Sequence, residues 1–88
     1  MEEKEYTNIE TALKQETKKW LLRLENETKN IHPKNTKDVK SSIKNMHAYI
    51  KDCKYFLEIG DLIRAFEAIV YAWGIFETLL TLKLIEKK

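Results

Sequence analysis

The sequence predicts an all-α protein that folds as an antiparallel up-down-up bundle of three helices. Two observations favour this fold. The 88 residues include only two glycines and one proline, the residue types that most often interrupt helices. The apolar residues recur at steps of three and four, a spacing that gathers them on one side of a helix. We expect residues 1–88 to form a single helical domain.

Pro33 and Gly60 mark the two predicted breaks between helices. A proline disfavours helical geometry at the residue before it, so a helix is expected to end near Asn30. Gly60 suits a left-handed helix end, and the following Asp61 suits the first cap of the next helix. The sequence therefore predicts helices over residues 6–30, 37–58 and 62–86. Their similar lengths and short connections favour antiparallel neighbours.

The first two predicted helices differ in the regularity of their apolar rows. The first helix has a weak row, flanked by Leu21, with two threonines in it: Ile9, Leu13, Thr17, Trp20, Leu24, Thr28 and Ile31. The second helix, capped by Asn35 or Thr36, has a regular seam: Val39, Ile43, Met46, Ile50, Cys53 and Leu57. Tyr49 and Phe56 widen one side of that seam. The regular seam predicts that the second helix contributes a continuous strip to the core.

The third predicted helix is the most apolar of the three. Its main row consists of Leu62, Phe66, Ile69, Trp73, Phe76 and Leu80, and a second row adds Ala65, Ala72 and Leu79. An apolar arc this broad is typical of a helix that contacts both partner helices or another subunit. Gly74 lies inside this helix, where glycine costs about 1 kcal/mol relative to alanine. Two explanations are open: Gly74 makes room for a neighbour such as Trp20, or another molecule approaches closely beside Tyr71.

Composition and motifs argue against several classes of function. Cys53 is the only cysteine, so an internal disulfide is impossible, and we expect it in the core. Neither His32 nor His47 has the spacing of a metal ligand. The apolar stretch 68–76 is too short to span a membrane. We therefore expect a cytoplasmic protein that is not an enzyme, with no catalytic residues, cofactor or metal. An enzyme would need a pocket joining groups from Asp52, Asp61, Glu67 and Tyr71.

A row of basic residues follows the second predicted helix. Its members recur at steps of three and four: Lys37, Lys40, Lys44, His47, Lys51 and Lys54. Such a row can contact phosphates through charge, and it can equally be a solvated flank of a lysine-rich protein. Asp38, Asp52 and Glu58 lie among these lysines in the sequence and are expected to interrupt their field.

The segment 55–74 resembles a known protein family. It contains a Gly-Asp joint, an Ala-Phe-Glu-Ala helix start and a Tyr-Ala-x-Gly segment, at residues 60–61, 65–68 and 71–74. These features are similar to those of the archaeal family known as domain of unknown function 357. The resemblance implies a small helical archaeal protein and implies no activity.

The leading functional hypothesis is an interaction or assembly module. We expect it to form a homodimer through the third helix, or to bind another protein there, with contacts from Phe66, Tyr71, Trp73 and Gly74. The alternative hypothesis is nucleic-acid binding through the basic row of the second helix, with contacts from Lys37, Lys40, Lys44, Lys51 and Lys54.

Overall fold

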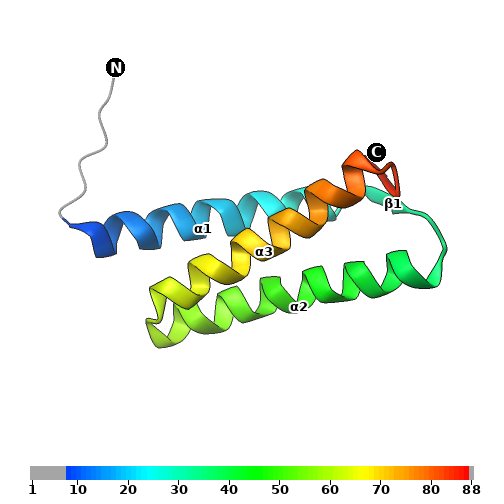
Figure 1. Ribbon diagram of the computed structural model, residues 1–88. Coiled ribbons are helices and arrows are strands. Elements are labelled where there is room, and N and C mark those ends of the chain that lie inside the picture. The colour runs from blue at the N-terminus through cyan, green and yellow to red at the C-terminus, as the bar shows by residue number, and fades with distance from the viewer. Residues whose placement is uncertain (1–7, 88) are drawn as a thin grey trace, which may run out of the picture.

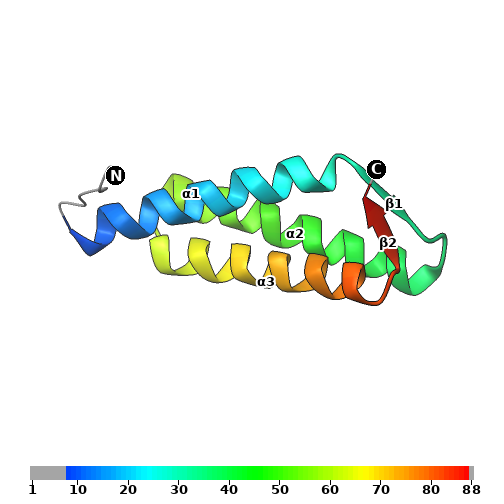
Figure 2. The same cartoon turned by 90° about the horizontal axis from the view of Figure 1, so that it is seen from above.

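Three helices and a small two-stranded sheet make up residues 8–87, the part of the chain that the computed structural model describes. The helices are α1 (Ile9–Thr28), α2 (Lys37–Ile59) and α3 (Leu62–Thr81), and the strands are β1 (Ile31–Pro33) and β2 (Ile85–Lys87). The helices alternate in direction, and all three lie side by side (Figures 1 and 2). The predicted all-α three-helix fold is therefore confirmed.

Polar side chains cap the start of each helix. The side chain of Asn8 accepts a hydrogen bond from the backbone N–H of Thr11, at 2.7 Å. Thr36, one of the two predicted caps, does the same for Val39. Asp61 begins α3 as the sequence predicted. These bonds satisfy N–H groups that have no partner within the helix.

Gly60 ends α2 in the left-handed conformation, with φ of 81°. The backbone N–H of the next residue, Asp61, then donates to the carbonyl oxygen of Phe56 at 2.8 Å. This bond to the carbonyl five residues back is typical of a helix end closed by glycine. The predicted break between the second and third helices is confirmed.

The end of α3 corrects the predicted helix 62–86. The helix stops at Thr81, and the chain turns at Lys83, which adopts a left-handed φ of 58°. The N–H of Leu84 donates to the carbonyl oxygen of Leu79 at 2.9 Å, so the turn repeats the glycine-type helix end without a glycine. The chain then reverses into β2, which pairs antiparallel with β1 and places Ile85 opposite Pro33.

The first predicted helix, 6–30, also differs at its ends. Residues 6 and 7 lie outside the described residues, and α1 ends at Thr28 rather than at residue 30. The N–H groups of Lys29 and Asn30 bond back to the carbonyls of the last turn. The shorter helix leaves Ile31 free to enter β1, where it pairs with Lys87.

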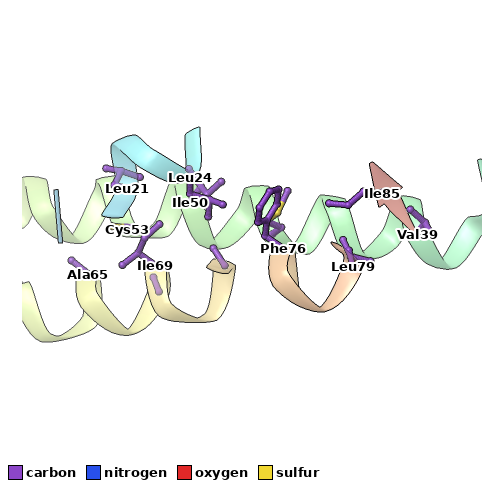
Figure 3. Packing of buried hydrophobic residues seen from close by; sticks show 13 residues of the cluster. Leu21, Leu24, Val39, Ile50, Cys53, Ala65, Ile69, Phe76, Leu79 and Ile85 are labelled. Carbon is purple, nitrogen blue, oxygen red and sulfur yellow. The ribbon is translucent and has the colours of Figure 1, made fainter. Parts of the chain in front are cut away.

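The core runs along the contact between α2 and α3, and α1 and β2 close it from the side (Figure 3). Phe76 of α3 and Met46 of α2 are fully buried near its centre. In α1 the predicted row is wrong at Ile9 and Trp20, which are exposed, whereas Leu21, predicted to flank the row, is buried. Thr17 is fully buried, and its hydroxyl donates to the carbonyl oxygen of Leu13.

Candidate functional site

One side of α3 is largely apolar and exposed, with the charged Glu67 placed among Ile63, Val70 and Tyr71 at helical neighbour positions. Val70 is 51% exposed, Tyr71 is 62% exposed and Ile63 is 68% exposed. Phe66 lies on the same side and is partly exposed. We call the surface formed by Ile63, Phe66, Val70, Tyr71 and Gly74 the α3 outer face. Exposed apolar residues scattered singly are ordinary, but a contiguous apolar helix face marks a surface that can bind another molecule.

Gly74 lies in the middle of the α3 outer face and is exposed. A Cβ atom added at this position meets nothing within 4 Å. The predicted explanation that Gly74 makes room for Trp20 inside the fold is therefore wrong. The helix carries the cost of a glycine although its own chain does not need the space.

Two hollows flank Gly74, and both are lined by Val70 and Gly74. The first, of about 510 Å³, extends toward α2 and is lined by Ser42, Val70, Tyr71, Gly74, Ile75, Thr78 and Leu79. The second, of about 420 Å³, extends toward α1 and is lined by Trp20, Phe66, Ile69, Val70, Trp73, Gly74 and Glu77. Because no side chain rises from Gly74, the two hollows adjoin across the helix. The resulting surface, with two adjoining hollows at Gly74, can accept a ridge of side chains from another molecule.

The four residues predicted for the interaction site divide into two groups. Tyr71 and Gly74 lie on the α3 outer face, and Phe66 stands at its edge. Tyr71 is held by stacking on Tyr49 of α2, with ring centroids 5.4 Å apart. Trp73 is half-buried and packs against Trp20 of α1. Trp73 thus contributes one wall of a hollow, whereas Val70 and Ile63, absent from the predicted site, are more exposed.

The basic row of α2 is exposed along its whole length. Its exposed members are Lys37, Lys40, Lys44, His47, Lys51 and Lys54. At the last position, the ammonium of Lys54 forms a salt bridge with the carboxylate of Glu25 on α1. The predicted nucleic-acid contacts are therefore not equivalent, because the charge of Lys54 is compensated within the fold.

A groove of about 340 Å³ lies between α1 and α2 beside this row. Its lining consists of Glu25, Thr28, Lys29, His47, Ile50, Lys51 and Lys54. Lys29 comes from the end of α1 and was not among the predicted contacts. Whether Lys29 lines the groove depends on how α1 packs against α2, so the spacing of residues within the α2 sequence does not indicate it.

Two titratable groups singled out from the sequence, Asp61 and Cys53, have structural roles in the fold. Asp61 caps α3, and its hydrogen bonds from the side chain and the backbone N–H of Arg64 lower the pKa of its carboxyl. Burial raises the pKa of the Cys53 thiol to about 11, and the charge of Glu25 adds to the rise while Lys54 opposes it. Cys53 is fully buried, as predicted.

Two features are absent from the described residues. Within residues 8–87, no group of three or more histidine, cysteine, aspartate or glutamate residues is arranged to hold a metal ion. Among the helices of the same residues, none combines the length and apolar character required to cross a membrane.

Comparisons with known proteins give the chain a family. The DUF357 family, described as protein of unknown function, matches residues 6–85. A crystal structure of a DUF357 protein from Archaeoglobus fulgidus is 40% identical in sequence and superposes with a TM-score of 0.82. The match covers 92% of this chain and 100% of that chain. No curated protein matches. The resemblance seen in residues 55–74 thus extends over most of the sequence, and the chain belongs to the DUF357 family.

Proposed function

We propose that this protein is an assembly module whose copies pair through the α3 outer face. The supporting observation is the exposed apolar surface around Gly74, which the described part of the chain leaves uncovered. Transfer of such side chains from water into an interface stabilises a complex by roughly 25 cal/mol per Å² of apolar surface. A glycine at the centre allows the backbone of a second helix to approach closely.

A second copy of the chain fits this face because the face is self-complementary. At about 100° per residue, Ile63, Val70, Gly74 and Thr81 lie within about 40° of one another around α3. Along α3, residues 70 and 74 each lie two positions from residue 72, and residues 63 and 81 each lie nine positions from it. A two-fold axis at the level of residue 72 sets Val70 of one copy against Gly74 of the other. It also sets Ile63 against Thr81, as an isologous dimer requires.

Size-exclusion chromatography with light scattering tests this proposal across micromolar concentrations. The wild-type chain should approach about 21 kDa, twice its monomer mass of 10.5 kDa. Gly74→Arg should give a monomer, because the new side chain occupies the space taken by the partner's Val70. The matched control is Ala48→Arg, which adds the same charge at an exposed position of α2 that lines neither hollow.

The fold of each variant can be checked independently by far-ultraviolet circular dichroism. Gly74→Arg should keep its helix content, since a Cβ atom at this position meets no atom of the described residues within 4 Å and arginine favours helix over glycine. A wild-type chain that stays at 10.5 kDa at every concentration contradicts the proposal. A dimer that survives both Gly74→Arg and Val70→Arg shows that the contact lies elsewhere.

Nucleic-acid binding through the basic row of α2, the alternative function predicted from the sequence, involves a different surface. Neither hollow of the α3 outer face includes a lysine of that row. Self-association therefore neither requires nor prevents it.

A further inference from the structure

The basic groove between α1 and α2 collects positive charge from both helices. Lys29 lines it from the end of α1, and His47 and Lys51 line it from α2. All three side chains belong to exposed residues. Glu25 is the acidic residue of the lining, and its carboxylate pairs with Lys54. Lys29 and Lys51 therefore leave the groove with a positive balance, which a concave surface concentrates. The groove is thus the place along the basic row where an anion meets lysines from two directions.

Acidic residues limit this field at one end only. Glu25 neutralises Lys54, and Glu58 lies two turns beyond Lys51 on the same line of α2. At about 100° per residue, Asp38 and Asp52 lie more than 90° away from the middle of the row. They therefore do not interrupt it, contrary to the expectation from the sequence. The uncompensated part of the row runs from Lys37 to Lys51.

We propose that this surface binds the phosphate backbone of a nucleic acid. Lys29 and Lys51 contact phosphates in the groove, and the backbone continues along α2 past Lys44 and Lys40 to Lys37. The lysines supply charge without base contacts, so binding is independent of sequence.

The shape of the surface favours a polymer over a single phosphate group. The basic row from Lys37 to Lys51 extends over about 21 Å of helix, with steps of about 5 Å between members and His47 between Lys44 and Lys51. The row contains no arginine, the residue suited to a bidentate grip on one phosphate. A single ion gains from one or two of these lysines, whereas a chain of phosphates gains from all of them.

Fluorescence anisotropy with a labelled single-stranded RNA of about 12 nucleotides and a DNA duplex tests this proposal. Five phosphate contacts predict that affinity for the single strand falls roughly 100-fold between about 50 and 200 mM salt. Lys29→Gln and Lys51→Gln should each lower the slope of log affinity against log salt by about 0.7. Inorganic phosphate at the same phosphate concentration should not displace the RNA.

A control variant separates this groove from general charge. Lys19→Gln removes the same charge beside Trp20, where Lys19 lies 6.0 Å from the ring centroid, and should leave the slope unchanged. The self-association variant Gly74→Arg should retain nucleic-acid binding, so the two proposals can fail separately.

Three results would overturn the proposal. One is an absence of binding to both nucleic acids at about 50 mM salt, where charge contacts are strong. Another is an equal fall in slope for Lys19→Gln and Lys51→Gln, which means that only net charge matters. The last is displacement of the RNA by inorganic phosphate, which means that a single anion suffices.

Discussion

Trp73 of α3 donates its indole N–H to the backbone carbonyl oxygen of Trp20 on α1, with a nitrogen-to-oxygen distance of 3.0 Å. The two rings also meet edge to face, with centroids 5.6 Å apart and planes at 88°. The guanidinium of Arg23 lies over the Trp20 ring at 5.1 Å. This pair joins helices that are far apart in the sequence and fixes α1 along the side of α3.

Trp73→Phe should destabilise the fold by about 1 kcal/mol. It removes the donor and leaves the carbonyl oxygen of Trp20 without this bond, whereas the aromatic ring that contacts Phe76 is retained. Urea denaturation measures the change. Trp20→Phe retains the hydrogen bond, because the acceptor belongs to the backbone, and should cost less. Equal losses for the two variants would show that ring size, not the hydrogen bond, holds α1 in place.

Phe76→Ala and Phe66→Ala should differ strongly in stability although both remove a phenylalanine from α3. Phe76 is 1% exposed and Phe66 is 37% exposed. Removal of a buried phenylalanine ring costs about 3–5 kcal/mol, and a partly exposed one costs less because part of its surface already meets water. Thermal unfolding of dilute protein measures both. Similar losses of stability would place Phe66 in the core and contradict its placement at the edge of the α3 outer face.

Lys83→Gly should stabilise the protein by about 1 kcal/mol. Lys83 holds a left-handed φ of 58° at the end of α3, which costs a residue with a Cβ roughly 1–2 kcal/mol, and glycine avoids this cost. Chemical denaturation measures the gain. Lys19→Gly, within α1, should destabilise instead, because glycine disfavours ordinary helix. A loss of stability in Lys83→Gly would show that the side chain itself supports the turn.

Stability should fall with rising pH through the buried thiol of Cys53. Its pKa is about 11 in the fold against an ordinary value of 9.0, so between these pH values the unfolded chain loses a proton that the native chain keeps. Proton release then favours unfolding, by on the order of 2 kcal/mol at the upper limit. The test compares the pH dependence of unfolding free energy in wild type and Cys53→Ala. Parallel curves would contradict the prediction.

Much of the fold follows from local sequence. Gly60 ends α2 because a left-handed residue costs glycine least, and Asp61 and Thr36 cap helices through their own side chains. The regular seam of α2 likewise predicts its buried residues Val39, Met46, Ile50 and Cys53, with Ile43 and Leu57 of the same seam partly buried. Interactions between residues a few positions apart produce these features, so a single sequence contains them.

The candidate sites were less predictable. The identity of Gly74 indicated an unusual position, but only the packed structure shows that the space above it is open. Lys54 and Lys51 look alike in the sequence, and they differ because Glu25 of another helix reaches one of them. Contacts between distant segments set these differences.

The sequence by itself determined three helices, their breaks and their family. Only the tertiary structure decided where α3 stops, because Lys83 lacks the signal of a glycine or proline. The chain turns there because a reversal lets β2 pair with β1 and buries Ile85 at the end of the core. Pairing and burial favour the turn over a further turn of exposed helix. The same packing of α1 and α2 against α3 left Gly74 and its apolar neighbours uncovered.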